Sequence, residues 1–597
     1  METETPAAGP WRYFTAGLLL AVLLLYGPAL GFGYVWDDEI IILKNADLQR
    51  PELSWALLGR PVLEDTSYFR PLVFLSWWLE YRALGTLSPA LSHAVNLGLF
   101  YLALLLCYRL FQRLLPGPAP RRRAWAALGT VLYLCHPAQL EQVVWISGRF
   151  DLLANVFLLA ALLLFLRPQR SRLANGALLL CGIGALGAKE TGLLLLPLLY
   201  CLQLWRQWPE RPWDWRAAWR SERGLWLALL LLDGGYFWLR SAYGSGLYHR
   251  GLDWAYLRYY YIEQQAPLLA WAEYLRYGLW PFGHHLITPL EFIRPRPGLL
   301  ASALVLTGAS LGLLALAGWR RWRLGPLLLA YGVSLVLVLH LLPLDAQENL
   351  RQDRYLGLAL VFLIVLLLLG AQRLQARWPR LTAGVLLLYG LSWLMVSAGH
   401  LRWWRSDEAL YGQMNRYHLP LSGGISHKGY FMELLKRPGR RALARLLLAN
   451  EDWLSQRYQR PSDIDRHYQL AGYLLQTYQD PAGLDLLEEI LPLLETSSGV
   501  PARKLDNSYL LLASGRLLLR QDVAGAAAPL ERLLARNPSQ PLGLKLAWVI
   551  ATLRGDEPAR QQAEAALKAQ NPSPADWQQL RQSVAEVCAR KRFPGCP

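Results

Sequence analysis

Three acidic residues directly follow the first apolar stretch of the chain, in the string Trp36-Asp37-Asp38-Glu39. Adjacent carboxylates repel one another, which raises the pKa of at least one of them. A carboxylate of that kind suits a general base, and a cluster of them also suits a metal ligand. A solvated acidic loop would have the same composition. We therefore treat Asp37 and Asp38 as candidate catalytic residues, with a divalent metal as an option that the sequence does not require.

Further charged residues stand where other apolar stretches end, and charges at a membrane edge are functional candidates. The forked donors of arginine fit a phosphate group, so we predict that the cations of this set bind phosphate. An ion pair between Arg149 and Asp151, or a lysine at 189 that only reaches toward the interface, would be the structural alternative. The predicted phosphate ligands are Arg149, Lys189, Arg351 and Arg354, and the supporting residues are Arg70, His136, Glu141, Asp151 and Glu190.

Apolar segments dominate the first two thirds of the chain. The 597 residues are 54% hydrophobic, more than a soluble domain usually carries. Runs of about 20 apolar residues are long enough to cross a bilayer as helices. The stretch 266–287 is interrupted by charges, proline and glycine, so we interpret it as interfacial or re-entrant. The predicted spans are eleven in number: 13–33, 90–115, 125–140, 152–167, 173–188, 191–205, 225–240, 299–318, 325–344, 355–371 and 381–398.

Arginine residues orient these predicted spans. The net charge is +17, and the arginines concentrate in the loops that follow every second span. Because cationic loops face the cytoplasm, we attribute the charge to membrane topology and not to binding of nucleic acid. The candidate residues and the tail beyond the eleventh span then lie outside the cytoplasm. Cys588 and Cys596, close together in that tail, are a candidate disulfide in an oxidising compartment.

The tail carries an internal repeat. Asn537-Pro538-Ser539 recurs as Asn571-Pro572-Ser573, and Arg520-Gln521-Asp522 recurs as Arg554-Gly555-Asp556, both after 34 residues. That period is typical of tetratricopeptide repeats, which pair helices across polar turns. Helices near 463–478 and 482–495 look like the same unit. Such repeats bind peptides or partner proteins, whereas a plain helical cap would need no ligand.

Five blocks of sequence resemble one family in their order and spacing. They read YVWDDEIIILKN, YFRPLVFLSWWLEY, SHAVNLGLF, HPAQLEQVVWISGRFDLLA and GAKETGLLLLPLL, and ENLRQDRYLGL matches more loosely. Together they resemble the GT-C fold glycosyltransferases, above all the membrane O-mannosyltransferases with C-terminal tetratricopeptide repeats. The family's late motif is closer to ERY, where this chain has Asp353-Arg354-Tyr355.

The resemblance implies a reaction and roles for particular residues. A polyprenyl-phosphate sugar would donate its glycosyl group, with inversion, to a hydroxyl acceptor. Asp37 would take the position of the base with Asp38 beside it, and Arg149, Lys189 and Arg354 would bind the donor phosphate. The shortened repeat array and the altered late motif leave the acceptor and the sugar open.

We therefore expect an all-α chain in three parts: a transmembrane GT-C-like catalytic domain over 1–400, a connector over 401–440, and an extracytoplasmic repeat domain over 441–597. The expected activity is inverting transfer from the lipid-linked donor to an exported protein or peptide. Membrane lipids are the other partner, and the expected location is a bacterial inner membrane with the site on the periplasmic side. A lipid or glycan acceptor is one alternative, and a non-catalytic scaffold or transporter that recruits partners is another.

Overall fold

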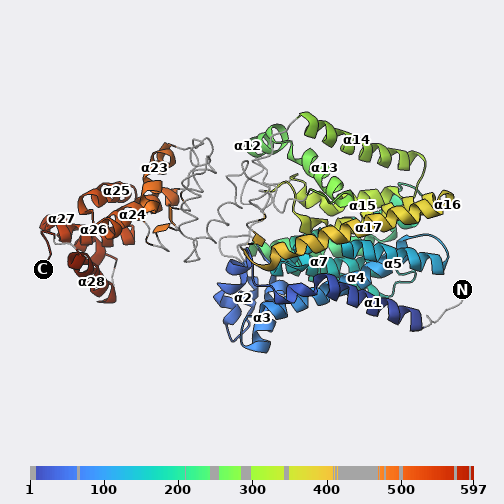
Figure 1. Ribbon diagram of the computed structural model, residues 1–597, viewed down its shortest axis with the longest axis horizontal. Helices are drawn as coiled ribbons and strands as arrows, with labels where there is room; N and C mark the ends of the chain where they lie inside the picture. The colour runs from blue at the N-terminus through green and yellow to red at the C-terminus, as the bar shows by residue number, and fades with distance from the viewer. Residues whose placement is uncertain are drawn as a thin grey trace. The chain divides into compact units, whose positions relative to one another are not determined.

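The computed structural model describes two compact units, Met1–His418 and Leu419–Pro597. The described residues are 8–62, 68–208, 210–242, 254–283, 297–341, 349–407, 481–496, 502–570, 574–590 and 593–596, with a few short pieces between 409 and 479. Within them the chain forms helices and no strand (Figure 1). The predicted all-α fold is therefore confirmed. Most of the predicted connector lies outside the described residues.

A bundle of helices forms the first unit, and a described helix overlaps each of the eleven predicted spans. Within the described part of the chain, six stretches are long and apolar enough to cross a membrane: Trp11–Gly31, Pro89–Leu114, Ile146–Phe165, Gly298–Trp319, Asp353–Arg377 and Pro379–Arg405. Two further apolar stretches, Arg172–Ala188 and Gly325–Val338, are shorter. The helices are α1 (Ala8–Tyr26), α4 (Pro89–Leu114), α5 (Ala119–Cys135), α7 (Arg149–Phe165), α8 (Arg172–Ala188), α9 (Leu195–Gln207), α11 (Arg223–Ala242), α14 (Pro297–Trp319), α15 (Gly325–Leu335), α16 (Leu356–Arg377) and α17 (Pro379–Leu401).

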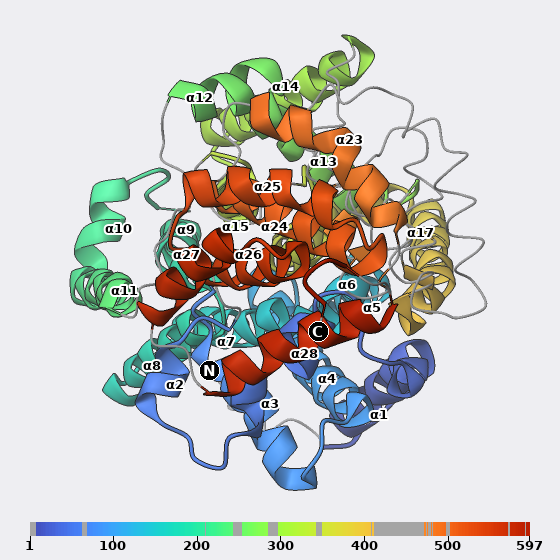
Figure 2. The ribbon, with the colours of Figure 1, turned by 90° about the vertical axis from the view of Figure 1, so that its left-hand side faces the viewer.

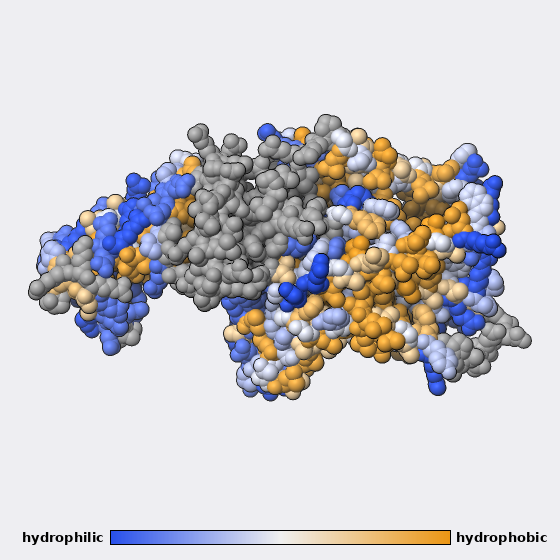
Figure 3. All heavy atoms as spheres, in the orientation of Figure 1, coloured by the Kyte–Doolittle hydropathy of each residue, from blue (hydrophilic) through white to orange (hydrophobic). Residues whose placement is uncertain are grey.

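The position of each helix in the bundle follows its apolar pattern. The first ten residues of α16 are all buried, and most of α7 is buried where it packs against α4 and α8, so α7 and α16 form the centre. A helix that is apolar on every side can only be stable inside a core or in lipid. Helix α17 leaves Leu387, Leu388 and Met395 exposed, as a lipid-facing helix would. Figure 3 shows hydrophobic side chains gathered over this flank of the unit.

Short helices occupy the segments that the sequence presents as loops. The predicted loop 34–89 contains η2 (Glu39–Leu43), η3 (Ala46–Gln49), α2 (Trp55–Gly59) and α3 (Pro71–Leu84), whose Val73, Phe74 and Trp77 are buried. The other short helices are α6 (Gln139–Val143), η4 (Ile146–Gly148), η5 (Glu190–Leu194), α13 (Ala266–Leu279) and η9 (Asp353–Tyr355). At 14 residues, α13 rises only about 21 Å, which is less than a bilayer core of about 30 Å. These helices give the membrane-flanking residues fixed positions.

Paired helices form the second unit, in the order α23 (Ala482–Thr496), α24 (Ala502–Leu519), α25 (Val523–Arg536), α26 (Pro541–Arg554), α27 (Glu557–Lys568) and α28 (Pro574–Arg590). Consecutive helices from α23 to α27 pack against each other (Figure 2). Asp522 and Asp556, 34 residues apart, cap α25 and α27 in the same way, because each side chain accepts from the backbone N–H three residues later. Cys588 and Cys596 form a disulfide. Asn571-Pro572-Ser573 lies outside the described residues, and the tetratricopeptide assignment stays a prediction.

Candidate active site

Asp38 is fully buried, and both oxygens of its carboxylate accept hydrogen bonds. One accepts from the backbone N–H of Val35 at 3.1 Å, and the other accepts from the backbone N–H of Ser147 at 2.9 Å and from the Ser147 hydroxyl. Burial raises the pKa of Asp38 to about 7, although these hydrogen bonds favour the ionised form. Asp38 therefore ties the segment after α1 to the loop before α7.

Asp37 has a different environment from its neighbour. Its side chain is half-buried and makes no hydrogen bond with the described part of the chain, while its carbonyl oxygen accepts from Ile40 and Ile41. Burial raises the pKa of Asp37, and the charge of Arg354 opposes that rise. A partly exposed carboxylate that makes no hydrogen bond with the described residues is available to take a proton from a substrate.

Trp36 holds the backbone next to Asp37 in an uncommon conformation. Its φ is +59°, a left-handed value that costs a bulky residue strain energy. The backbone N–H of Trp36 donates to Asp407 at 2.7 Å. Its ring lies 4.9 Å from the ring of Trp145 and 6.4 Å from that of Trp404. These contacts offset the strain in the backbone of Trp36. They also fix the direction in which the side chain of Asp37 points.

A network of opposite charges connects α6, α7, η9 and the turn between α8 and α9. The guanidinium of Arg354 pairs with Glu141 and lies 3.6 Å from Asp151. Asp151 in turn accepts twice from Lys189, at 2.7 Å each. The ring of Tyr355 lies 4.4 Å from the ammonium of Lys189 and 5.0 Å from the guanidinium of Arg354. Asp151 and Tyr355 therefore hold two cations side by side.

Arg70 and Glu190 extend this network from the first long loop. Arg70 donates to Glu190 at 3.2 Å, and its guanidinium lies 4.2 Å from the ring of Phe150. Burial alone would raise the pKa of Glu190, but Arg70 and Lys189 outweigh it and hold the pKa at about 2. Burial lowers the pKa of Lys189 to about 8, against the opposing charge of Asp151. Glu190 thus stays ionised beside cations that have lost much of their hydration.

Arg70, Lys189 and Arg354 each keep N–H groups that donate to no described residue. The Nε of Arg70 is buried without a partner. Lys189 donates two hydrogen bonds to the carboxylate of Asp151, and the Nη2 of Arg354 has no partner among the described residues. Arg70, Lys189 and Arg354 define what we call the cation cluster. Forked, charge-assisted donors of this kind are suited to a phosphate group.

Arg149 does not belong to the cation cluster. It is fully buried, and its guanidinium donates to Asn96 at 2.7 Å, to Ser76 at 2.9 Å and to the carbonyl of Ser92 at 2.9 Å, with an ion pair to Glu80. These bonds use donors on all three nitrogen atoms. The geometry therefore does not support the predicted phosphate contact of Arg149, nor the alternative pair with Asp151, and it indicates a structural clamp between α3, α4 and α7.

Arg351, the other predicted phosphate ligand, also has different neighbours. It pairs with Asp353, lies 4.0 Å from Glu273 on α13, and its guanidinium is 3.8 Å from the ring of Tyr277. It is 2% exposed. This arginine therefore anchors α13 to the segment before α16, and the structure gives it no position in the cation cluster.

His136, predicted as a supporting residue, is a buried packing group. Its Nδ1 accepts from the backbone N–H of Ala138 at 3.1 Å, and its Nε2 lies 3.3 Å from the carbonyl oxygen of Gly278. The ring meets that of Trp393 edge-on at 4.5 Å. Because Nδ1 accepts, Nε2 carries the proton, and the neutral ring links α5, α13 and α17.

Several residues that shape the site were not predicted from the sequence. Ser147, Trp145, Trp404 and Glu80 act through partners far away in the chain, so a local motif could not identify them. A weak signal did exist for Glu80, the one acid on the mostly apolar α3. Among the described residues, no three or more His, Cys, Asp or Glu side chains gather to hold a metal ion.

Comparison with known proteins finds relatives of one kind. The chain is 34% identical over 189 residues to protein O-mannosyl-transferase Tmtc2 of Drosophila melanogaster, which covers 29% of this chain and 20% of that protein. It is 33% identical over 190 residues to Tmtc1 of the same species, covering 30% and 21%. The human protein O-mannosyl-transferase TMTC1 is 31% identical over 195 residues, covering 29% and 21%.

These matches are restricted in extent. They span about a fifth of the length of the relatives. No family model matches the chain, and no solved structure is significantly similar to it. The predicted resemblance to membrane O-mannosyltransferases is confirmed: over less than a third of its length, this chain is similar to protein O-mannosyl-transferases of insects, nematodes and mammals.

Proposed function

We propose that this chain is a membrane glycosyltransferase that moves a sugar from a polyprenyl-phosphate donor to a hydroxyl group of an exported protein. The observation that carries the proposal is the partly exposed carboxylate of Asp37, which makes no hydrogen bond with the described residues and on which the charge of Arg354 in the cation cluster acts. The names of the relatives support a protein acceptor and suggest mannose as the sugar.

The proposed reaction is a single displacement at the anomeric carbon. Asp37 accepts the proton of the acceptor hydroxyl while the hydroxyl oxygen forms a bond to C1 of the sugar. The bond between C1 and the phosphate oxygen breaks, and the electron pair leaves with the polyprenyl phosphate. The leaving phosphate gains one negative charge, which Arg70, Lys189 and Arg354 stabilise in a site of low water content. Attack from the face opposite the phosphate inverts C1.

The cation cluster suits this leaving group better than it suits a transported ion. Its residues lie at the ends of the membrane helices, between α8 and η5, in η9 and before α3, where the phosphate of a lipid resides. A transporter would place its charges mid-span along a pathway. The acidic partners Glu190, Asp151 and Glu141 hold Arg70, Lys189 and Arg354 in position, which fixes the donors before a phosphate binds.

The membrane orientation belongs to the same proposal. The alternation of arginine-rich loops assigns Asp37 and the cation cluster to the extracytoplasmic face. The disulfide between Cys588 and Cys596 supports an oxidising compartment for the tail. We propose that the helical pairs of the tail recognise the polypeptide acceptor, because stacked helical pairs present extended binding surfaces.

The test is transfer in a reconstituted system. The purified full-length chain in lipid nanodiscs receives a radiolabelled polyprenyl-phosphate mannose and an exported acceptor protein. We expect labelled protein, and an Asp37→Asn variant that is slower by about 10²–10⁴-fold, the usual contribution of a general base. Glu52→Gln, which removes an exposed acid from the same loop, should retain normal turnover.

Two outcomes would contradict the proposal in different ways. If the label appears in lipid or glycan and never in protein, the acceptor belongs to another class than the one proposed. The proposed displacement at C1 would still stand. Near-normal turnover by a folded Asp37→Asn protein would reject the assigned base. Intact-mass measurement of the labelled product distinguishes the first outcome from the second.

A further inference from the structure

Two adjoining cavities lie at the other end of the bundle, between α4, α5, α9, α15 and α16. Their volumes are about 350 and 370 Å³. Pro116, Leu369 and Arg373 line both. Nineteen residues separate Arg373 from Arg354, and at 1.5 Å per helical residue this places the cavities roughly 28 Å from the cation cluster. They are therefore distinct from the candidate active site.

Four arginines surround these cavities without an acidic partner. They are Arg113, Arg121, Arg323 and Arg373, and none of the residues that line either cavity is acidic. Within the described residues, none of the four arginines forms an ion pair. Arg121 donates to the amide oxygen of Gln375 at 3.2 Å, and Arg323 donates to the carbonyl of Trp205 at 3.2 Å. The acceptors of these hydrogen bonds are uncharged, so the positive charges of the arginines are not balanced by a nearby acid.

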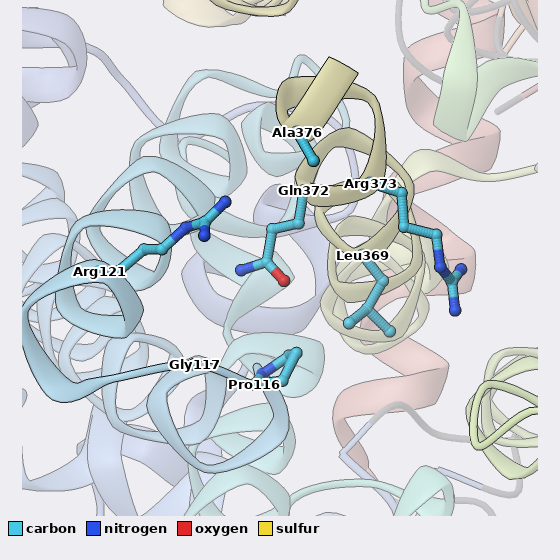
Figure 4. Close-up of a pocket in the computed structure, with 7 residues that line it drawn as sticks. All are labelled: Pro116, Gly117, Arg121, Leu369, Gln372, Arg373 and Ala376. Atoms are coloured by element: carbon cyan, nitrogen blue, oxygen red, sulfur yellow. The ribbon is translucent and has the colours of Figure 1, made fainter. Parts of the chain in front are cut away.

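The lining combines these cations with apolar surface and one unsatisfied amide. Figure 4 shows Arg121 and Gln372 directed toward each other across the cavity, with Pro116 and Leu369 on one side of the gap. The Nε2 of Gln372 is buried and has no hydrogen-bond partner. A buried amide without a partner is costly, so a ligand that offers an oxygen there would gain affinity. Trp205 and Leu324 add apolar surface in the second cavity.

We propose that this pocket binds the phosphate headgroup of an anionic glycerophospholipid from the surrounding bilayer. The phosphate would accept from Arg121 and Gln372, and the glycerol and upper acyl chains would lie against Pro116 and Leu369. Arg373 points away from Arg121 and Gln372 (Figure 4) and would attract the anion through its charge from the adjoining cavity. Arg113, Arg121 and Arg373 lie near the ends of α4, α5 and α16, and Arg323 lies just before α15, which is the depth of a lipid headgroup. Membrane topology alone explains why arginines occur in these loops. It does not explain why four of them line two adjoining cavities next to a buried amide that lacks a hydrogen-bond partner.

The test compares lipid retention by matched charge variants of the full-length protein. Nanodiscs contain phosphatidylcholine with or without phosphatidylglycerol, and native mass spectrometry counts the lipids kept after release. The first variant is Arg121→Gln with Arg373→Gln. The control is Arg167→Gln with Arg172→Gln, two exposed arginines assigned to the same membrane face that line neither cavity.

We expect the wild type and the control to retain phosphatidylglycerol in preference to phosphatidylcholine. The cavity variant should bind it about tenfold or more weakly, since each cation near a membrane surface contributes about 1 kcal/mol to anionic lipid binding. If the cavity variant does not fold, the pair Arg113→Gln and Arg323→Gln tests the same pocket with the same expectation. Equal loss in cavity and control variants would overturn the proposal. Saturation of the wild type by inorganic phosphate without lipid would also overturn it, because the site would then bind a free anion.

Discussion

Asp37 and Asp38 are neighbours in the chain, yet their carboxylates meet different surroundings. Ser147 and the backbone of Val35 donate hydrogen bonds to Asp38, whereas the carboxylate of Asp37 makes no hydrogen bond with the described residues and is influenced by the charge of Arg354. Pairs of carboxylates whose environments differ commonly divide their roles. The sequence identifies the pair because three acids follow an apolar span. It could not choose between the two, since Ser147 lies 109 positions from Asp38.

The pH dependence of turnover should reflect the ionisation of Asp37, and the charge of Arg354 should influence the pH at which it occurs. Burial raises the pKa of Asp37 and Arg354 opposes the rise, so the base loses its proton above the ordinary carboxylate value of about 3.9. Activity should therefore rise with pH along an acid limb. Arg354→Gln removes the opposing charge, so the limb should move to higher pH. The donor KM should increase about tenfold or more in the same variant, because a charge-assisted phosphate contact is lost.

The matched control for that prediction is Arg402→Gln. Arg402 is exposed at the end of α17 and has no ion pair among the described residues. Its variant should keep both the acid limb and the donor KM of the wild type. A pH profile of kcat/KM measured at saturating acceptor tests both variants. An unchanged limb in Arg354→Gln would mean that Asp37 is not the group that titrates.

Arg149 should behave as a structural residue. Arg149→Gln leaves Glu80 in a buried site without its cation, and breaking such a pair costs about 3–5 kcal/mol. Thermal unfolding in detergent should show a much lower midpoint, while the folded fraction keeps the donor KM of the wild type. Arg149→Met combined with Glu80→Leu removes both charges and should recover part of the loss. A raised donor KM with unchanged stability would instead restore the phosphate role to Arg149.

At the scale of elements, long helices were easier to predict than short ones. Each predicted span overlaps a described helix because a sustained apolar run leaves no other way to satisfy its backbone in lipid. The segment 34–89 gives no such signal, and its short helices depend on contacts with α7 and α8. The caps Asp522 and Asp556 explain why part of the tail repeat was visible in the sequence.

Close packing between α6 and η4 supports the site and can be tested with a glycine. A methyl group added at Gly148 would lie 2.4 Å from the carbonyl oxygen of Glu141, and 2.8 Å from the Cα of Gln142. Both contacts are with backbone and cannot be relieved by a side-chain rotation. Gly148→Ala should therefore displace Glu141 from Arg354, with a loss of stability of about 1–3 kcal/mol from overpacking.

A second glycine provides the comparison for this effect. A Cβ at Gly98, on the exposed side of α4, would meet nothing within 4 Å. Gly98→Ala should leave stability unchanged or raise it slightly, because alanine favours a helix over glycine. Thermal unfolding of both variants, together with turnover, gives the contrast. Equal stability of the two variants would show that η4 is free to shift away from α6.

At the scale of the molecule, the candidate site exists only in the folded bundle. Its members come from the segment after α1, the start of α3, α6, α7, η5 and η9. The sequence predicts that these charges share one membrane face, and the fold brings Arg70, Lys189 and Arg354 into one network while directing Arg149 and Arg351 elsewhere. Charge and apolar pattern determine the face, but only packing determines which cation meets which acid.

Membrane topology is the prediction on which the function of the whole molecule depends. With an odd number of spans, Arg123 at the start of α5 and Ser539 between α25 and α26 should lie on opposite sides of the membrane. Both side chains are exposed, so a cysteine at either position is accessible on its own side. The background variant replaces the free cysteines Cys107, Cys135, Cys181 and Cys201 and keeps the disulfide of the tail.

A membrane-impermeant maleimide applied to intact cells should label Ser539→Cys at once and Arg123→Cys only after the membrane is permeabilised. The physical reason is that the arginine-rich loops stay on the cytoplasmic side during insertion. Labelling of Ser539→Cys only after permeabilisation would place the tail in the cytoplasm. The cation cluster would then also lie in the cytoplasm only if an even number of spans separates it from the tail. A cysteine reporter at the exposed Glu52 tests on which side the site lies. If the Glu52→Cys variant is labelled in intact cells, the site faces the exported acceptor wherever the tail lies.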